Sequence, residues 1–482
     1  MSDQKYEAVI GLEVHIQLAT KSKAFCSDDT TFGRAPNTQV GVVSLGHPGV
    51  LPKVNSEQIA HAVRLGQALG CRINLRNTFD RKNYFYADLP KGYQITQDQS
   101  PICIGGALPI KLGEEWRSID IHHIHMEEDA GKSIHTLDPK KSMIDLNRAG
   151  VPLLELVTEP DLRSAEEVDA FMSGMRQLVR YLGVSDGNME QGSMRCDINV
   201  SIRPRGAEYL MDRCEVKNVN SMRYARQAIA YEFKRQQQIV EGGGTVRQQT
   251  LNFDPATGRT SPLREKEDAH DYRYFPEPDL PPIVLSEAYI AASAKKLPYL
   301  PWQLHELFRK EYDLPDYDAT LLTADAPVAA AFIALCKKTK NFKAASNLMI
   351  NKLIPHCQEN NLAIADFPVS FRQLAAFISL IDEDKVSNTT AYQRLFPALV
   401  EQPGQDPADL AEQMNLVQSS DSDFLEGIAK QVLADFPGKV SAYQNGKKGL
   451  LGFFMGQLMK RSKGKADPKA ANKLLQELLD AS

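Results

Sequence analysis

The sequence is poor in cysteine and has no closely spaced pair of cysteines. Its 482 residues include seven cysteines and two tryptophans. Because no C-x-x-C pair occurs, a thiolate zinc knuckle is not indicated. An odd number of scattered cysteines also argues against a disulfide framework and is typical of a reducing compartment. We therefore expect a cytoplasmic protein.

Long apolar segments are absent as well. The N-terminal stretch MSDQKYEAVIGLEV lacks the apolar core of a signal peptide. The most apolar run, APVAAAFIALC, is far shorter than the roughly 20 residues that span a bilayer. We expect no membrane partner. Neither sign of charge dominates, since the net charge is −5. Binding to a nucleic acid would therefore need a local basic patch.

The order of the sequence patterns predicts three domains. Strand-like alternation and turn residues dominate the first part of the chain, whereas apolar spacings of three and four dominate the rest. The polar stretch EQPGQDPAD then separates two groups of helices. We predict an α+β protein with a large mixed domain containing an antiparallel sheet (1–294), an all-α domain (295–406) and a small all-α tail (407–482).

The stretch VIGLEVHIQL predicts a strand with one polar face. Glu13 and His15 share that face, and the opposite face carries Leu12, Val14, Ile16 and Leu18. A carboxylate and an imidazole two residues apart suit a metal ion. The alternative is a half-exposed strand whose polar face is solvated.

The stretch IHHIHMEEDAGK crowds histidines and carboxylates together. Alternation places Glu128 on the same face as Ile124 and Met126, whereas His125 and Glu127 face the other way. A buried carboxylate needs a partner, and a cation is the usual one. The following AGKS is not the end of a P-loop, because Met126 stands where the first glycine is required.

Two further strands complete the set. Glu155 interrupts the apolar run VPLLELV and is a second inward carboxylate, unless it pairs with an arginine of the core. The strand SMRCDINVSIRP carries a polar face that suits a nucleotide or phosphate, followed closely by a lysine: Arg195, Asp197, Asn199 and Lys217. The alternative for this face is a solvated surface with scattered ion pairs.

Taken together, these residues favour magnesium. Several carboxylates with a single well-placed histidine form a hard, oxygen-rich set of ligands, which magnesium prefers and zinc does not. Magnesium beside basic side chains indicates phosphoryl transfer, in which a protein mainly positions groups and neutralises charge.

The sequence resembles one family through six long motifs that occur in the same order. They are VIGLEVHIQL, FDRKNYFYADLPKGYQITQ, HMEEDAGKS, DLNRAGVPLLELVTEPD, MRCDINVSIRP and DYRYFPEPDLPP. They resemble the B subunit of the tRNA-dependent amidotransferases, the GatB family. The resemblance extends through the tail segment KGLLGFFMGQLMKRSKGKADP and so covers nearly the whole chain.

The resemblance implies a three-subunit enzyme with a glutaminase A subunit and a small C subunit. It implies that the B subunit uses ATP and Mg²⁺ to phosphorylate the side-chain carboxylate of Glu-tRNA(Gln) or Asp-tRNA(Asn). Ammonia channelled from the A subunit then displaces the phosphate. Carried over residue by residue, the family's magnesium site implies Glu13, His15, Glu128 and Glu155 as catalytic and metal-binding residues.

The same resemblance implies roles for other residues. The motifs DRKNYFY and PKGYQ implicate Lys82, Tyr84 and Lys91 in guiding ammonia or contacting the acceptor end of the tRNA. Aromatic packing with lysines that reach solvent is the alternative for each. Arg195, Asp197, Asn199 and Lys217 are the candidates for contacts with ATP and the substrate.

One departure from the family concerns zinc. Many members carry four cysteines near the N-terminus, whereas this chain keeps Cys26 and has Asp28, Gly41 and Ser44 at the other three places. A structural zinc site needs four ligands, so we predict no structural zinc.

The last fifty residues are rich in lysine. Such a segment suits contact with a phosphate backbone. The alternative is a basic surface that is only solvated. We therefore expect a tail that binds tRNA. Two other functions stay open. A stand-alone metal-dependent hydrolase predicts turnover without partners, and a non-catalytic tRNA-binding scaffold predicts that Glu128→Gln leaves the complex active.

Overall fold

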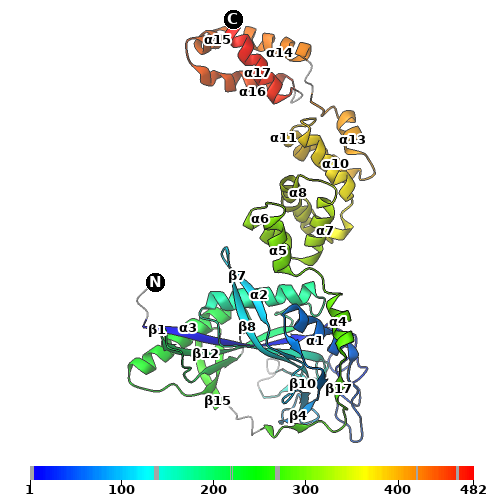
Figure 1. Cartoon of the computed structure of the whole chain (residues 1–482), viewed down its shortest axis with the longest axis vertical. Helices are drawn as coiled ribbons and strands as arrows, with labels where there is room; N and C mark the ends of the chain where they lie inside the picture. The colour runs from blue at the N-terminus through cyan, green and yellow to red at the C-terminus, as the bar shows by residue number, and fades with distance from the viewer. Residues whose placement is uncertain are drawn as a thin grey trace. The chain divides into compact units, whose positions relative to one another are not determined.

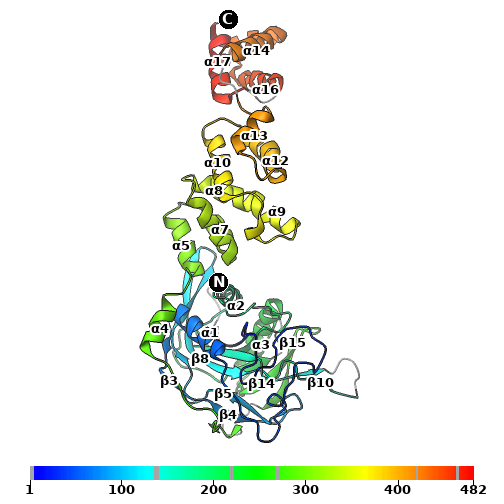
Figure 2. The ribbon, with the colours of Figure 1, turned by 90° about the vertical axis from the view of Figure 1, so that its right-hand side faces the viewer.

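The computed structural model describes residues 5–134, 140–217, 219, 221–265, 272–418, 422–462 and 466–481. They form two compact units, Met1–Gln303 and Leu304–Ser482 (Figures 1 and 2). The first unit contains a large sheet with helices, and the second contains helices. This arrangement confirms the predicted α+β class.

The first unit is built on a ten-stranded sheet in which every pairing is antiparallel except β13 with β14. Strand β7 (Ala107–Leu112) pairs only with β8. The order of the other strands is β15 (Arg259–Glu265), β14 (Gln249–Asp254), β13 (Cys214–Lys217), β12 (Met194–Pro204), β1 (Tyr6–Gln17), β11 (Pro152–Thr158), β8 (Glu115–Glu128), β6 (Cys103–Ile104) and β2 (Arg72–Ile73).

The four strands predicted from the sequence are neighbours in the middle of this sheet. They stand in the order β12-β1-β11-β8, although long stretches of chain separate them in sequence. The pairing register sets His15 opposite both Glu155 and Arg195, and it sets Glu155 opposite His125. Residues directly opposite one another share a face of the sheet, so polar groups from four strands converge.

The apolar face of these strands forms the core of the unit. Leu12, Val14 and Ile16 are fully buried among side chains of α1 (Ser56–Ala68), α2 (Ala165–Tyr181) and α3 (Met222–Glu241). Figure 1 shows α2 lying along one face of the sheet. Burial of each such side chain contributes about 1.5–3 kcal/mol, which fixes the register and leaves the other face for polar groups.

Three small sheets accompany the large one. They are β4 (Asp80–Asn83) between β5 (Tyr93–Thr96) and β16 (Phe275–Pro276); β9 (Lys132–Ile134) with β10 (Met143–Asp145); and β3 (Arg76–Asn77) with β17 (Ile283–Val284). The first of these sheets carries Lys82 on β4, and Lys91 lies in the turn that leads into β5.

The first unit ends nine residues after the predicted boundary at residue 294, at Gln303. Helix α4 (Glu287–Ala294) is followed by Leu297, Leu300 and Trp302, which pack on the core of the first unit. These apolar side chains, rather than the change from strands to helices, determine where the unit ends.

The named secondary-structure elements of the second unit are all helices. Its longer helices are α5 (Pro301–Lys310), α6 (Asp316–Thr323), α7 (Ala326–Cys336), α8 (Phe342–Leu348), α9 (Ile354–Glu359), α10 (Phe371–Asp382), α12 (Phe396–Glu401), α13 (Pro407–Gln413), α14 (Ser422–Asp435), α15 (Pro437–Gln444), α16 (Leu451–Arg461) and α17 (Pro468–Ala481). The polar break predicted at 401–409 falls between α12 and α13. Helices α14 to α17 share a separate core that includes Leu425, Phe454 and Leu475.

Across the described ranges, no single helix combines the length and the hydropathy needed to cross a membrane. Helices α6 and α7 satisfy both criteria only as a pair, and the chain bends by 118° between them.

Candidate metal centre

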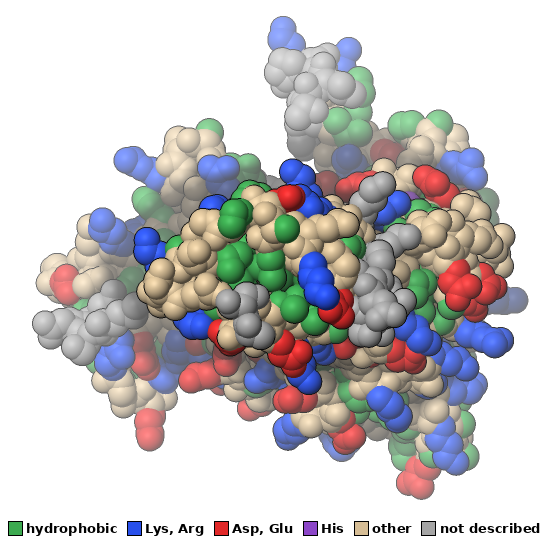
Figure 3. Space-filling view, turned by 90° about the horizontal axis from the view of Figure 1, so that it is seen from above, with side chains coloured by type: hydrophobic (Ala, Val, Ile, Leu, Met, Phe, Trp, Pro, Cys, Tyr) green, Lys and Arg blue, Asp and Glu red, His purple; other side chains and the backbone are tan. Residues whose placement is uncertain are grey.

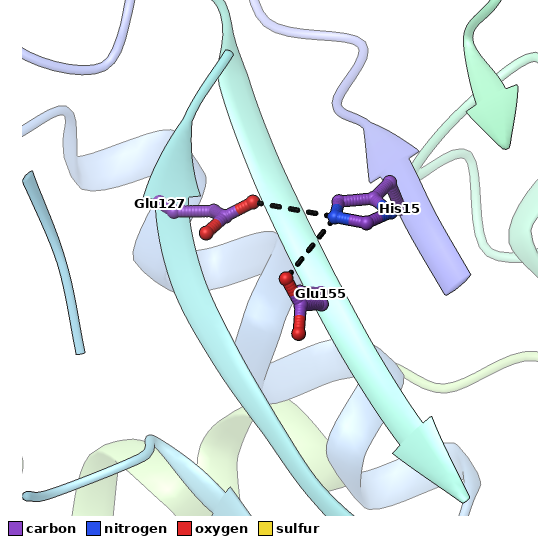
Figure 4. Close-up of side chains that lie close together, drawn as sticks. All are labelled: His15, Glu127 and Glu155. Atoms are coloured by element: carbon purple, nitrogen blue, oxygen red, sulfur yellow. Dashed lines mark ion pairs between the residues drawn. The ribbon is translucent and has the colours of Figure 1, made fainter. Parts of the chain in front are cut away.

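A histidine and two glutamates converge on the polar face of the central sheet. Nε2 of His15 lies 3.1 Å from Oε2 of Glu155 and 3.9 Å from Oε1 of Glu127. The three side chains come from β1, β11 and β8 respectively, and they point toward one another (Figure 4). One potential ligand atom from each lies within 4.8 Å of the others. The three strands therefore present a compact group of ligands.

The charges in this cluster support one another. Burial by itself lowers the pKa of His15, but the hydrogen bond and charge of Glu155 and the charge of Glu127 raise it to about 9. Burial by itself raises the pKa of Glu155. The charge of His125 and the hydrogen bond with His15 outweigh the effect of burial, so that pKa lies well below the ordinary value. The carboxylate of Glu155 is thus kept ionised.

The donor set fits a divalent cation. Two carboxylates and one imidazole supply oxygen and nitrogen ligands without a thiolate, which suits Mg²⁺ or Mn²⁺ better than a structural zinc. His125 supports the cluster from β8, because its Nε2 lies 3.4 Å from Oε2 of Glu127. A neighbour that fixes a ligating carboxylate in this way is typical of metal sites.

Glu128 lies outside this cluster. Successive side chains of a strand point to opposite faces, so Glu127 reaches His15 and Glu128 points away. The buried Glu128 carboxylate forms an ion pair with Lys91 and accepts a hydrogen bond from the backbone N–H of Ile95. Among the described residues, the cation beside this buried carboxylate is the ammonium of Lys91, and the role of Glu128 as a metal ligand stays a prediction.

Glu13 belongs to a second group of carboxylates on the same face. Glu13, Asp197 and Glu215 have ligand atoms within 4.8 Å of one another. The ammonium of Lys217 lies 2.8 Å from Asp197 and 2.7 Å from Glu215. Burial opposes the charge of Lys217, but these two carboxylates raise its pKa above the ordinary value. Lys217 thus acts as the internal cation of this group.

The remaining candidates for ATP contacts lie on β12. Nη2 of Arg195 donates to Asp129 at 2.8 Å, and Nδ2 of Asn199 donates to Oε1 of Glu13 at 2.9 Å. Both residues are on the same face as the cluster, since Arg195 pairs with His15 and Asn199 pairs with Gly11. The structure therefore gathers all four predicted contact residues on one polar face.

Lys82 and Tyr84 lie near the cluster among aromatic rings. Nζ of Lys82 is 4.7 Å from the ring centre of Tyr272 and 5.9 Å from that of Tyr84. The charge of Lys82 is felt at the cluster, because it contributes to lowering the pKa of Glu155. Burial and the charge of Glu127 raise the pKa of Tyr84, which stays a neutral hydrogen-bonding group.

Cys26, Asp28, Gly41 and Ser44, the four positions considered above for zinc, belong to one hydrogen-bonded loop region. The carboxylate of Asp28 accepts hydrogen bonds from the Gly41 N–H at 2.7 Å and from the Ser44 hydroxyl at 2.6 Å. Sγ of Cys26 lies 3.5 Å from Oγ of Ser44. The fully buried ammonium of Lys23 is 4.0 Å from Asp28 and donates to the carbonyl of Gln39 at 2.7 Å. Direct hydrogen bonds hold this loop.

Basic and acidic side chains are interspersed over the face drawn in Figure 3. Several lysines and arginines have acidic partners, for example Lys448 with Asp480 at 2.7 Å and Lys469 with Asp384 at 2.6 Å. The basic composition of the tail therefore translates into a mixed surface in which some cations are already paired.

Two members of these groups were not selected from the sequence, Glu127 and Glu215. The signal for Glu127 was present, since alternation already placed it on the face of His125. Glu215 stands beside Lys217 in CEVK, and it joins the site because β13 pairs with β12. No local pattern reveals that pairing.

Both units of the chain match known family models. Residues 8–291 match the family model described as "GatB/GatE catalytic domain", and residues 330–479 match the "GatB domain". The chain belongs to the GatB family.

Relatives resemble the chain over its full length. A protein from Salinibacter ruber is 46% identical over 500 residues, which cover 100% of this chain and 98% of the relative. A protein from Trichlorobacter lovleyi is 47% identical over 475 residues, covering 98% and 99%. Both relatives are named as the B subunit of an aspartyl/glutamyl-tRNA(Asn/Gln) amidotransferase.

Proposed function

We propose that this chain is the subunit of a tRNA-dependent amidotransferase that activates the amino acid carried by a misacylated tRNA. In this proposal it uses ATP and Mg²⁺ to phosphorylate the side-chain carboxylate of Glu-tRNA(Gln), Asp-tRNA(Asn) or both. Ammonia then replaces the phosphate, giving Gln-tRNA(Gln) or Asn-tRNA(Asn). The observation that carries the proposal is the convergence of His15, Glu127 and Glu155 on the face that also holds Arg195 and Lys217.

The chemistry accounts for these groups. A carboxylate is a poor acyl donor, because its leaving group would be oxide. When a carboxylate oxygen attacks the γ-phosphorus of ATP, ADP departs and the oxygen becomes part of a good leaving group. Ammonia then attacks the carbonyl carbon, and inorganic phosphate is released. The first step brings two anions together, and the second releases a phosphate anion, so fixed positive charge is required.

His15, Glu127 and Glu155 would hold the magnesium ion, and a bound ion would neutralise charge on the phosphates. The role of the chain's own residues is positioning. Strands β1, β8 and β11 fix the ligands on rigid backbone, and Arg195 is held in place by Asp129. Lys217 supplies a second cation on β13, oriented by Asp197 and Glu215.

Ammonia must arrive without water, because an acyl phosphate hydrolyses. We infer that a glutaminase A subunit supplies ammonia and that a small C subunit completes a heterotrimer, which the word "subunit" in the relatives' names supports. Lys82 and Tyr84 beside the cluster, and Lys91 on its far side, are the residues proposed to guide ammonia or contact the acceptor end. The second unit is proposed to bind the tRNA, and the site of action is the cytoplasm.

The test is amidation by the chain assembled with its A and C partners. Glu-tRNA(Gln) and Asp-tRNA(Asn) are supplied with ATP, Mg²⁺ and ammonium chloride, so that the glutaminase is bypassed. We expect amidated product from the wild type and none from Glu155→Gln, with Glu166→Gln on α2 as the matched control. Equal product from Glu155→Gln would remove the cluster from the mechanism. Hydrolysis of phosphate esters without tRNA or partners would favour the hydrolase instead.

A further inference from the structure

Three histidines of β8 form a row that ends at the metal cluster. His122 is exposed, His123 is half-buried and His125 is buried. Nδ1 of His122 lies 2.6 Å from Nδ1 of His123, and Nε2 of His123 lies 3.2 Å from Nδ1 of His125. This histidine row therefore leads from the protein surface to the carboxylates of the cluster without a break.

A β-bulge in β8 assembles the row. The pairing of β8 with β11 slips by one residue between His123 and Ile121, so His122 is the extra residue. Ile121 and Ile124 are both buried in the core, although they stand three positions apart. Strict alternation would turn His122 toward that core, and the bulge leaves it exposed instead. Bulges commonly re-aim side chains beside functional sites in this way.

The spacing of two ring nitrogens in the row suits a shared metal ion. Two nitrogens that each lie roughly 2.0–2.1 Å from one tetrahedral zinc ion are about 3.3 Å apart. The observed separation between Nε2 of His123 and Nδ1 of His125 is 3.2 Å. The rings are stacked, with 18° between their planes, and rotation about the Cβ–Cγ bond of His123 turns its lone pair onto the ion.

The surroundings of His125 are those of a metal-binding imidazole. Its Nε2 lies 3.4 Å from Oε2 of Glu127 and 3.7 Å from Oε2 of Glu155, so this nitrogen keeps its hydrogen while Nδ1 faces His123. Histidines that bind a metal through one nitrogen almost always donate the hydrogen of the other to a carboxylate, a carbonyl or water. The carboxylates thus leave Nδ1 as the ligand atom.

His123 is prepared for the same role. Burial and the charges of His125 and His122 lower the pKa of His123 to about 4, so its imidazole is neutral at physiological pH. Nδ1 of His123 can donate its hydrogen to His122, which leaves the lone pair of Nε2 free. Metal ions bind imidazole only in its neutral form.

We propose that His123 and His125 bind a transition-metal cation of the zinc type, at a site separate from the magnesium site of the cluster. Imidazole suits Zn²⁺, Ni²⁺ and Cu²⁺, whereas Mg²⁺ prefers oxygen ligands. Water completes the coordination, and exposed His122 marks the side from which the ion enters. Such an open site differs from the four-ligand structural zinc considered above at Cys26.

An ion at this site acts on the cluster through one ring. His125 lies between the proposed ion and Glu127, so binding at Nδ1 fixes the ring whose Nε2 contacts that carboxylate. The site depends on the histidine row and its bulge, and it does not depend on the proposed function. Zinc binding is therefore measured on the full chain without tRNA, ATP or partner subunits.

The test compares zinc and manganese binding in matched variants. Zn²⁺ is titrated by calorimetry into wild type, His123→Gln and His47→Gln, which replaces an exposed histidine outside the row. Electron paramagnetic resonance measures the Kd for Mn²⁺ at the cluster in the same proteins. We expect His123→Gln to bind one Zn²⁺ fewer per chain than wild type and to keep the wild-type Kd for Mn²⁺. His47→Gln should match wild type in both measurements.

His125→Gln removes the other ligand and should also lose one Zn²⁺, so it provides the zinc count if His123→Gln does not fold. The same amount of bound zinc in wild type and in both row variants would overturn the proposal. A loss of zinc in His123→Gln that comes with weaker Mn²⁺ binding would place the zinc in the cluster of His15, and it would overturn the separate site as well.

Discussion

Glu127 and Glu128 are adjacent in the chain, yet their carboxylates serve opposite faces of the same strand. Glu127 lies 3.9 Å from Nε2 of His15, and Glu128 forms an ion pair with Lys91. The pleat of β8 separates two carboxylates that would otherwise repel one another. One is available to a metal ion, and the other is neutralised by the protein itself.

This separation predicts different effects on metal binding. Glu127→Gln removes a charged ligand and should raise the Kd for Mn²⁺, used as a magnesium probe, by about tenfold or more. Glu128→Gln should leave that Kd within about twofold, because its carboxylate faces Lys91. Electron paramagnetic resonance of free Mn²⁺ measures both. A larger loss in Glu128→Gln than in Glu127→Gln would restore Glu128 as a ligand.

Lys217 should be replaceable by a divalent cation. Lys217→Met leaves the carboxylates of Glu13, Asp197 and Glu215 close together, so we expect a loss of about 1 kcal/mol in the free energy of unfolding. Mg²⁺ should raise the Tm of this variant more than that of wild type, since it relieves the repulsion. Lys217→Arg keeps the charge and is the control. Equal Mg²⁺ stabilisation of all three proteins contradicts the role of internal cation.

Asp28 should stabilise the first unit in a pH-dependent way. Burial raises its pKa, but hydrogen bonds from Ser44 and Gly41 lower it below the ordinary value of 3.8. Because the pKa of Asp28 is lower in the folded than in the unfolded protein, the ionised carboxylate stabilises the fold. This contribution is complete at pH values above the unfolded pKa, and it is lost as the pH falls through the folded pKa. Asp28→Asn should therefore cost about 1–3 kcal/mol at neutral pH and progressively less below about pH 4.

The measurement is urea unfolding at several pH values, followed by tryptophan fluorescence. Both tryptophans of the chain, Trp116 and Trp302, lie in the first unit, and Trp302 stands at its boundary. Asp212→Asn, at an exposed position, is the matched control. A cost for Asp28→Asn that stays constant from neutral to acidic pH would contradict the hydrogen-bonding account.

Removal of the tail should separate tRNA binding from metal binding. Helices α14 to α17 have their own core, and the metal cluster lies wholly in the first unit. Deletion of 408–482 should therefore weaken binding of tRNA to the assembled complex and leave the Kd for Mn²⁺ unchanged. Filter binding measures the affinity for tRNA, and electron paramagnetic resonance titration measures the Kd for Mn²⁺. Full tRNA affinity in the truncated complex would mean that other surfaces bind it.

Much of the fold could be predicted because apolar and polar side chains alternate strictly along its central strands. VIGLEVHIQL and MRCDINVSIRP indicate both their conformation and their two faces, and the structure contains them as β1 and β12. The order β12-β1-β11-β8 could not be predicted in this way, because pairing between distant segments leaves no local pattern. The convergence of the ligands depends on that order.

The candidate site, like the fold, could be predicted in part from the sequence. His15 and Glu155 were selected from the sequence, and the structure brings them to 3.1 Å. Glu128 was selected because an inward carboxylate needs a cation, whereas the structure places Glu127 closer to His15; the role of Glu128 as a ligand stays a prediction. The cation that pairs with this carboxylate, Lys91, lies thirty-seven residues earlier in the chain and reaches it through the fold. Sequence identifies a buried charge more readily than its partner.

The cluster is carried by strands that are paired on both sides, in the interior of the ten-stranded sheet. Backbone amides in such strands exchange with solvent only when the whole unit opens, so the ligands of the site share the slowest motions of the molecule. Adaptation to different substrates must then come from the loops and helices around the sheet. Natural variants that change specificity should accumulate at that periphery, while the frame holding the ligands stays the same.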